Sequence, residues 1–336
     1  MEKAVSGPAA LFQMFQAHHV SAALRGAVDI GLFGAIHGGA RDVAAIAEKI
    51  QCPERSTRIV ADALVALGLL KKEGPHYALG PLAAEHLVPG KPEYLGELAN
   101  VMGADYMWQA LSHLGDAIKA GGCTLPEHAE TPQLRFWETF AQSTTAMSVP
   151  GTLAVHDVVG PWLASRDRPT LLDVAAGSGT YGYTMVKQVP ALRATLLDWP
   201  NVLVETRRMG KQFGVDEQRV NYIEGNLFDV DFGGPYDVVL MSQIFHHFGP
   251  TVCESLLVKA ASALKRDGKL VIHDFLTDGD NPAARMFSLT MLATTKKGES
   301  FASTDFEPWC KGAGLTSFSV HAVSGAPTSI IVAGRG

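Results

Sequence analysis

The chain has 336 residues and a formal net charge of −6, and its 47% hydrophobic and 18% charged residues are typical of a globular protein with room for two or three domains. The acidic excess argues against a protein built mainly to hold nucleic acid. The four cysteines are too far apart for a metal or redox motif, and no apolar run has the length of a membrane span or a signal-peptide core, so we expect a cytoplasmic protein.

The first hundred residues predict a small domain that is mainly helical. Residues 11–33 place apolar side chains at helical spacing, and the pattern stops at Gly34. Two more helices are expected over 41–50 and 52–70, and residues 69–80 form two short β-prone runs around a Gly-Pro turn. This order of helices and hairpin is the winged-helix pattern.

A winged helix often binds DNA, so a ligand-responsive DNA-binding regulator is one alternative. Residues 1–105 carry nine Lys/Arg and eleven Asp/Glu, without the basic excess that phosphate neutralisation favours. We interpret Arg55 and Arg58 as solvated surface charges. The first helix is apolar over much of its surface, which suits a partner chain. We therefore predict that residues 1–105 form a dimerisation domain.

Residues 106–165 predict a helical connector with an aromatic face. Phe136, Trp137 and Phe140 recur at helical spacing, and Met147 continues the same face. These side chains are either part of an interdomain core or the wall of a small-molecule pocket between domains.

From residue 166 to residue 336, strands and helices alternate. This alternation predicts a parallel sheet with helices on both faces. The expected strands are 170–176, 194–200, 219–225, 235–243 and 268–276, with helices over 180–189, 201–213 and 251–265. Residues 316–323 and 328–334 read as a closing antiparallel pair, which is unusual for a dinucleotide domain and typical of the methyltransferase version of this sheet.

The segment LLDVAAGSGTYG at 171–182 contains a glycine-rich loop directly after a predicted strand. Its G-x-G-x-x-G pattern fits a dinucleotide pyrophosphate, and Asp198 follows after about twenty residues, so a dehydrogenase is a second alternative. Asp173 is a poor neighbour for pyrophosphate and a good one for the cationic methionine end of S-adenosylmethionine. Gly177 and Gly179 allow the backbone to approach a ligand closely.

Later strand ends supply further candidate cofactor contacts. Asp198 can accept both ribose hydroxyls, which suits either ligand. Trp199 can lie on the adenine face, and Asn226 can hydrogen-bond its amino group, with Leu227 and Phe228 around the ring. Together with Asp173 and the glycines, these residues favour S-adenosylmethionine.

The chain resembles, over nearly its whole length, the S-adenosylmethionine-dependent O-methyltransferases of the caffeic-acid and hydroxyindole type, especially bacterial members that tailor secondary metabolites such as antibiotics. The resemblance rests on GAVDIGLF, FWETFAQSTTAM, LLDVAAGSGTYG, LLDWPNV, EGNLF, SQIFHHF, KLVIHDF and MLATTKKGE. It implies an α/β, Rossmann-like seven-stranded methyltransferase sheet, an N-terminal all-helical or winged-helix dimerisation domain, a homodimer and a small aromatic acceptor. The chain departs from the family at Ala175 and Ala176, which replace two glycines, at Asn226, which replaces Asp, and at Ser242, which replaces a cofactor-contacting lysine.

Catalytic roles follow from the same resemblance. His246 takes the place of the family's general base, a role that suits an imidazole. His247 stands where the family has Asp, and we expect it to give structural support. Asp274 and Glu299 match the carboxylates that hold the base. The resemblance adds Ser242, Gln243 and Met147 to the cofactor contacts, and Met286, Phe287, Met291 and Thr295 to the acceptor contacts.

A metal site is a further alternative, because His246, His247, His273 and Asp274 lie near the same predicted sheet edge. His273 and Asp274 are neighbours on a strand and point to opposite faces, so we expect no metal. The function we expect is methyl transfer to a hydroxyl, phenolic in character, of a small aromatic or polyketide-type product. Nitrogen or carbon acceptors, and a cofactor-binding enzyme that catalyses decarboxylation, hydroxylation or cyclisation instead, are the remaining alternatives.

Overall fold

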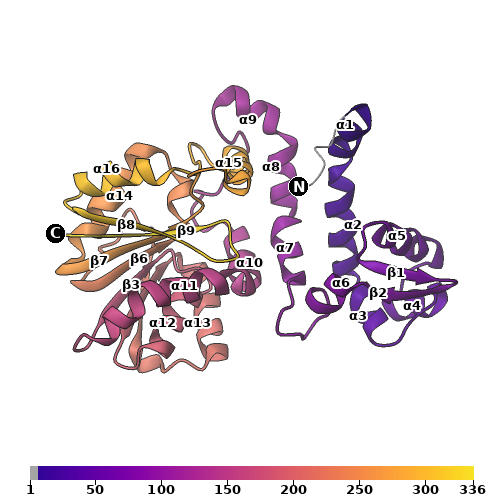
Figure 1. Ribbon diagram of the computed structural model, residues 1–336, viewed down its shortest axis with the longest axis horizontal. Coiled ribbons are helices and arrows are strands. Elements are labelled where there is room, and N and C mark those ends of the chain that lie inside the picture. Colours follow the sequence, from indigo (N-terminus) through magenta and orange to yellow (C-terminus); the bar gives the residue numbers. More distant parts are fainter. Residues whose placement is uncertain (1–6) are drawn as a thin grey trace. The chain divides into compact units, whose positions relative to one another are not determined.

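A computed structural model describes residues 7–336, so the first six residues of the expected domain 1–105 lie outside it. The chain divides into two compact units, one up to Asp105 and one from Tyr106 to Gly336 (Figure 1). Among the described residues, no helix combines the length and apolar composition needed to cross a bilayer.

The first unit is a bundle of short helices with one small hairpin. In the hairpin, Leu70 pairs with Leu79 and Glu73 with His76. Leu32, Phe33, Leu64 and Tyr77 are fully or almost fully buried in its core. Its elements are α1 (Pro8–Phe15), α2 (Ala17–Asp29), α3 (Leu32–His37), α4 (Val43–Ile50), α5 (Glu54–Ala66), β1 (Leu70–Glu73), β2 (His76–Leu79), α6 (Pro81–His86), η1 (Gly96–Leu98) and α7 (Ala99–Met102).

The single helix expected over 11–33 is wrong, because the structure has three helices there. The chain breaks first at Gln16 and again at Gly31, whose left-handed φ of 71° is open to glycine at little steric cost. Helix α3 then runs through Gly34 to His37. Burial of Leu32 and Phe33 in the core outweighs the low helix propensity of Gly34.

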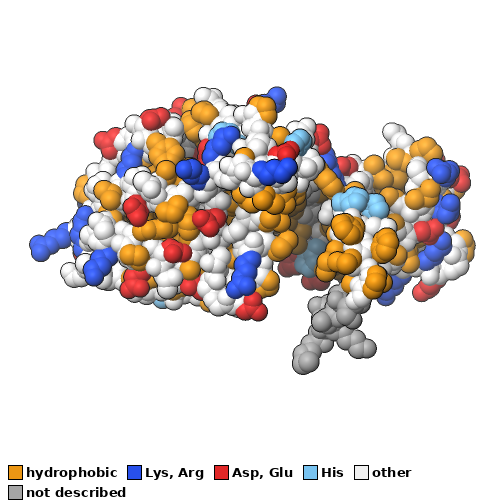
Figure 2. All heavy atoms as spheres, turned by 90° about the horizontal axis from the view of Figure 1, so that it is seen from above, with side chains coloured by type: hydrophobic (Ala, Val, Ile, Leu, Met, Phe, Trp, Pro, Cys, Tyr) orange, Lys and Arg blue, Asp and Glu red, His pale blue; other side chains and the backbone are white. Residues whose placement is uncertain are grey.

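Helix α1 carries exposed apolar side chains, as the sequence predicts for this part of the chain. Leu11, Phe12, Met14 and Phe15 are each more than half exposed. Hydrophobic side chains gather on this part of the surface in Figure 2. An apolar surface of this kind fits a protein partner better than water.

The second unit is built on a seven-stranded sheet, which confirms the expected fold class. The strand order is β5-β4-β3-β6-β7-β9-β8. Five strands are parallel, and β9 runs antiparallel to both β7 and β8. The strands are β3 (Thr170–Val174), β4 (Arg193–Asp198), β5 (Val220–Glu224), β6 (Tyr236–Ser242), β7 (Leu264–Asp274), β8 (Ser317–Ala322) and β9 (Ser329–Gly334).

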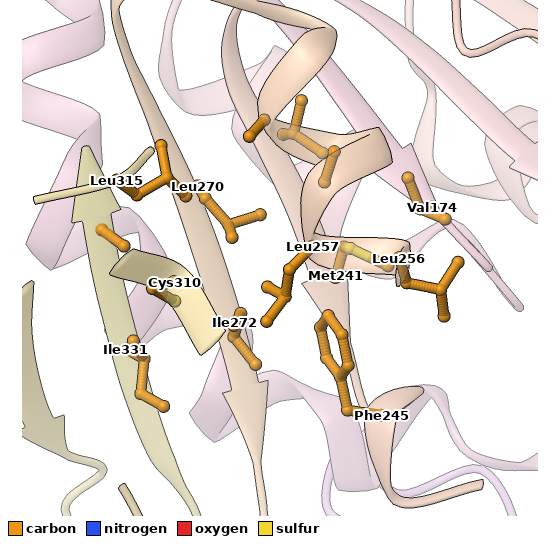
Figure 3. Packing of buried hydrophobic residues seen from close by; sticks show 14 of the residues in the cluster. Val174, Met241, Phe245, Leu256, Leu257, Leu270, Ile272, Cys310, Leu315 and Ile331 are labelled. Atoms are coloured by element: carbon orange, nitrogen blue, oxygen red, sulfur yellow. The ribbon is translucent and has the colours of Figure 1, made fainter. Parts of the chain in front are cut away.

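Helices cover both faces of this sheet (Figure 1). Side chains of β6 alternate between two cores: Val238 and Leu240 pack with α11 and α12, and Val239 and Met241 pack with α14 and α16. Figure 3 shows the second of these cores. The helical elements are α8 (Asp105–Ser112), α9 (Leu114–Ala120), α10 (Phe136–Ser143), α11 (Thr145–Ala164), α12 (Thr180–Gln188), α13 (Pro200–Phe213), η2 (Glu217–Arg219), η3 (Phe245–His247), α14 (Pro250–Ser262), α15 (Pro282–Thr294) and α16 (Ser303–Gly312).

Strand β7 begins earlier than the sequence predicts. The helix expected over 251–265 ends at Ser262, and Leu264 already pairs with Tyr236 across a bulge. Helices α15 and α16 follow β7 and have no counterpart among the predicted elements. The strand order reverses between the neighbours β3 and β6: β4 and β5 follow on the β3 side, and β7 follows on the β6 side. A ligand of such a sheet binds at this reversal, outside the carboxyl ends of the strands.

The amino end of the sheet is held by a buried carboxylate. Asp237 is fully buried and accepts hydrogen bonds from Lys265 Nζ (2.7 Å), from the backbone N–H of Thr170 (2.8 Å) and from Arg166 Nε. Burial alone would raise the pKa of Asp237, but these donors outweigh it and lower the pKa below its ordinary value of 3.8.

Asp237→Ala is expected to reduce the free energy of unfolding by about 2–4 kcal/mol, because it leaves two cations without their shared partner. The matched control Asp267→Ala removes the other carboxylate bound by Arg166, which is 64% exposed, and should cost about 0–1 kcal/mol. Urea unfolding of both variants measures the difference. Since the pKa is lowered in the folded state, the stabilisation by Asp237 is present at neutral pH and is lost as the pH falls below 3.8. Equal stability of the two variants would contradict this role.

Ala175 holds a left-handed backbone conformation directly after β3, with φ of 58°. This conformation costs a residue with a Cβ roughly 1–2 kcal/mol, whereas the extra chain entropy of glycine costs roughly 0.5–1 kcal/mol. Ala175→Gly is therefore expected to raise the free energy of unfolding by up to about 1 kcal/mol. Ala176, the next residue, has no positive φ, so Ala176→Gly should lower the stability by about 0.5–1 kcal/mol. Thermal unfolding compares the two, and a loss in both would show that Ala175 is unstrained.

Candidate functional site

Polar side chains collect at the carboxyl ends of the parallel strands. Asp173 lies on β3, Asp198 ends β4, Ser242 ends β6 and Asp274 ends β7. All four are buried. Because parallel strands end at one edge of a sheet, residues far apart in the sequence are brought to one place.

Asp173 has one carboxylate oxygen without a partner in the protein. Its Oδ2 accepts a hydrogen bond from the Gly182 N–H (3.0 Å), whereas its buried Oδ1 has no hydrogen bond. Burial raises the pKa of Asp173 to about 7, with a smaller contribution from the charge of Asp198. A buried carboxylate that lacks a partner is costly unless a donor or a cation completes it. The ammonium of S-adenosylmethionine fits this requirement.

Asp198 organises the glycine-rich loop. Its Oδ2 accepts from the Gly177 N–H (2.8 Å) and its Oδ1 from the Trp199 N–H (2.7 Å). Burial raises the pKa of Asp198 to about 6, and these two hydrogen bonds oppose the shift. Each carboxylate oxygen retains a lone pair, so the group can still accept two hydroxyls.

The two glycines of the loop serve different purposes. Both have positive φ. A Cβ on Gly179 would collide with the ring of Tyr183, whereas a Cβ on Gly177 would meet nothing within 4 Å. Gly179 is therefore required because a Cβ would clash there, and Gly177 because of its positive φ. The space beside Gly177 is open to a ligand.

The loop after β5 is shaped by Asn226. Its side-chain oxygen accepts from the Phe228 N–H (3.1 Å), which leaves the amide nitrogen as a donor to a ligand. Leu227 and Trp199 are half-buried. The exposed ring of Phe228 lies edge-on to Phe248 at 5.1 Å.

His246 and Asp274 form a buried pair. The His246 Nδ1 lies 2.5 Å from Asp274 Oδ1, which also accepts from the Phe275 N–H (2.8 Å). The His246 and Asp274 side chains are only 4% and 3% exposed, so solvent screens their interaction little. A carboxylate on Nδ1 fixes the imidazole tautomer and leaves Nε2 free to accept a proton.

His247 is a second buried histidine beside this pair. Its ring centroid lies 4.5 Å from that of His246 and 5.2 Å from that of Trp137, which it meets edge to face. Burial and, to a smaller extent, the charge of His246 hold the pKa of His247 well below 6.5, so the ring is neutral. Its Nδ1 is buried without a hydrogen-bond partner. His247 therefore contributes an uncharged polar surface.

His273 lies on the other side of the sheet from Asp274. Its Nδ1 is hydrogen-bonded to the Tyr181 hydroxyl (2.7 Å) and its Nε2 to the Thr328 hydroxyl (2.8 Å). Burial lowers the pKa of His273 to about 4. Residues 7–336 contain no group of three or more His, Cys, Asp or Glu arranged to hold a metal ion.

Each of the two histidines has an aromatic ring beside it, Trp137 next to His247 and Phe287 next to His246. Trp137 lies 5.2 Å from Phe136 and 5.4 Å from Phe140, and its Nε1 donates to the Ala129 carbonyl (2.9 Å). Phe287 lies edge-on to His246 at 4.7 Å. Such rings offer flat apolar contacts to an aromatic molecule.

Phe275 joins this wall, although it was not among the residues expected at the site. Its ring stacks on Phe287 at 4.2 Å. Phe275 directly follows Asp274 in the motif KLVIHDF. Its position next to a predicted site residue was the signal in the sequence that could have identified it.

The other expected site residues differ in how far they are exposed and in the hydrogen bonds they make. The Glu299 side chain is exposed, and Met286 is 65% exposed. Thr295 is fully buried, and its hydroxyl donates to the Met291 carbonyl (2.7 Å) and accepts from the Gly298 N–H (2.7 Å). The remaining expected contacts are the buried Met291 and Ser242 and the half-buried Met147 and Gln243.

Comparisons with known proteins identify the family. A family model described as the O-methyltransferase domain matches residues 137–316, and one described as the O-methyltransferase dimerisation domain matches residues 12–89. The chain is 29% identical to the tetracenomycin polyketide synthesis 8-O-methyl transferase TcmO of Streptomyces glaucescens, over 97% of each chain. It is 26% identical to the 3-hydroxy-5-methyl-1-naphthoate 3-O-methyltransferase of Streptomyces sahachiroi, covering 93% of this chain and 90% of that one.

The fold has a similar counterpart among solved structures. A Nostoc punctiforme protein assigned as an O-methyltransferase superposes with a TM-score of 0.92 at 29% identity, covering 98% of this chain and 99% of that one. The family match spans more than half of the chain and includes the strand ends that carry Asp173, His246 and Asp274. The chain belongs to the S-adenosylmethionine-dependent O-methyltransferase family.

Proposed function

We propose that this enzyme transfers a methyl group to a phenolic hydroxyl of a small aromatic or polyketide-type natural product, with His246 as the general base. The observation that carries the proposal is the buried His246–Asp274 pair with its Nδ1 to Oδ1 distance of 2.5 Å, next to aromatic rings. S-adenosylmethionine, when bound, supplies a methyl group already activated on a sulfonium. The protein therefore has to hold the acceptor in line and remove its proton.

His246 and Asp274 suit the proton transfer. With Nδ1 engaged by Asp274, Nε2 takes the hydroxyl proton, and Asp274 stabilises the resulting imidazolium. A positioned base contributes roughly 10²–10⁴-fold to the rate. The Glu299 side chain, by contrast, is exposed.

The proposed cofactor contacts come from three strand ends, and each strand end binds a different part of S-adenosylmethionine. The free Oδ1 of Asp173 receives the ammonium. Asp198 accepts the ribose hydroxyls, and the amide nitrogen of Asn226 donates to adenine, with Trp199 and Phe228 on the ring. Ser242, Gln243 and Met147 are expected to complete this side.

The proposed acceptor class rests on the aromatic walls and on the relatives. Trp137 lies against His247 and Phe287 against His246, and Phe136 and Phe140 pack on Trp137. The relatives from Streptomyces are named for methylating a polyketide and a naphthoate. A neutral His247 adds a hydrogen-bonding group without a second charge.

We also propose that the enzyme acts as a cytoplasmic homodimer. The dimerisation-domain match over 12–89 and the exposed apolar side chains of α1 support self-association.

The function is tested by transfer of labelled methyl from S-adenosylmethionine into an extract of the native cells. We expect label in one small molecule, and a rate lowered by about 10²–10⁴-fold in His246→Ala, because the proton then has no positioned acceptor. Asp274→Asn should lower the rate in the same direction. His247→Asn is the matched comparison and should lose much less, since His247 is already neutral. Full transfer by His246→Ala would remove His246 as the base, and cofactor binding without any transfer would favour a non-methylating reaction.

Cofactor binding is expected to depend on pH through Asp173. The ammonium requires the ionised carboxylate, and burial raises the pKa of this group to about 7. Affinity for S-adenosylhomocysteine should therefore fall as the pH drops below about 7, approaching tenfold per pH unit for one proton. Calorimetry measures this slope. In Asp173→Asn the affinity should be lower and the slope near pH 7 absent, leaving only the part near pH 6 where Asp198 titrates. A wild-type affinity independent of pH would exclude Asp173 as the ammonium partner.

A further inference from the structure

Lys259 on α14 reaches across to the loop after β5. Its Nζ donates to the carbonyl oxygens of Leu227 (2.8 Å) and Phe228 (3.0 Å), 32 and 31 positions earlier in the chain. The same ammonium lies 4.6 Å from the ring centroid of Phe232. Two carbonyls and one ring face therefore converge on a single half-buried cation.

The hydrogen bonds within this loop do not involve the carbonyl groups of Leu227 and Phe228. The Gly225 N–H donates to the Asp198 carbonyl (3.0 Å), and the Asn226 side chain accepts from Phe228. The Asn226 carbonyl accepts from the N–H groups of Asp229 (2.9 Å) and Val230 (3.1 Å). These hydrogen bonds form a turn at Asn226, and the two hydrogen bonds from Lys259 attach that turn to α14.

The loop also touches the segment that carries the base. Phe228 lies edge-on to Phe248 at 5.1 Å, and Phe248 directly follows His247. The orientation of residues 226–228 is therefore determined from two sides, by the Lys259 ammonium and by the Phe248 ring.

We propose that Lys259 is a positioning residue for the cofactor: it holds the turn at Asn226–Phe228 in the conformation that binds the adenine end. This proposal rests on the proposed function, in which Asn226 donates to adenine. Without the ammonium, the Leu227 and Phe228 carbonyls turn to water and the loop populates other conformations. Affinity then falls in proportion to the fraction of molecules that keep the binding conformation.

The test is calorimetric titration of the full-length protein with S-adenosylhomocysteine. Lys259→Met keeps the length and packing of the stem but removes the charge and the donors. We expect its affinity to be about 5- to 30-fold weaker, equivalent to ~1–2 kcal/mol. Lys259→Arg keeps a cation and several donors and should restore affinity to within about threefold.

Lys187→Met is the matched control. Lys187 also donates to a main-chain carbonyl, but it lies on α12 and its Nζ bonds the Phe213 carbonyl (3.0 Å) instead of the 226–228 turn. Its affinity should equal that of the wild type. Hydrogen exchange gives a second measure: the Asp229 and Val230 amides should exchange faster in Lys259→Met and stay unchanged in Lys187→Met.

The outcomes separate this inference from the proposed function. Wild-type affinity in Lys259→Met, or equal weakening in Lys187→Met, overturns the positioning role and leaves the methyltransferase proposal intact. Absence of binding by the wild-type protein overturns the proposed cofactor site and this inference with it. If Lys259→Met does not fold, Lys259→Leu, which also lacks the charge and the donors, provides the same comparison, and wild-type affinity in that variant overturns the proposal.

Discussion

Burial of ionisable groups at the carboxyl edge of the parallel sheet is the constraint on which the rest of this molecule depends. A charge in a low-dielectric interior must find a partner or change its protonation. His246 and Asp274 partner each other, and Asp198 takes two backbone N–H groups, whereas Asp173 Oδ1 and Asp274 Oδ2 are buried without a donor. The site is thus a place where folding leaves hydrogen bonds incomplete, and a ligand completes them.

Stability and reactivity are separated along the strands. At the amino ends, Asp237 gathers two cations and the Thr170 backbone into a fully satisfied network. At the carboxyl ends, Ala175 and Gln243 hold left-handed conformations with φ of 58° and 52°. Strain of this kind persists only where the surrounding structure enforces it. The strained backbone thus lies at the same end of the sheet as the proposed cofactor contacts.

The acceptor side depends on uncharged surfaces. His247 is neutral because it is desolvated, and it is held between His246 and Trp137. Phe287 meets the His246 ring edge to face and stacks on Phe275. In the function proposed above, these rings would place an aromatic acceptor by contact area, and the buried pair of His246 and Asp274 would accept its proton.

The sequence by itself determined the order of strands and helices, the closing antiparallel pair and the strand ends at which Asp173, Asp198, His246 and Asp274 stand, because alternation and motif spacing are local properties. It did not reveal the break at Gly31, the helices α15 and α16 or the early start of β7. Only the tertiary structure decided that the Glu299 side chain is exposed, that the Thr295 hydroxyl is used within its own turn, and that Lys259 reaches the Leu227 and Phe228 carbonyls. Those outcomes depend on how a helix is rotated and where a loop packs, and both are determined by contacts between residues far apart in the chain.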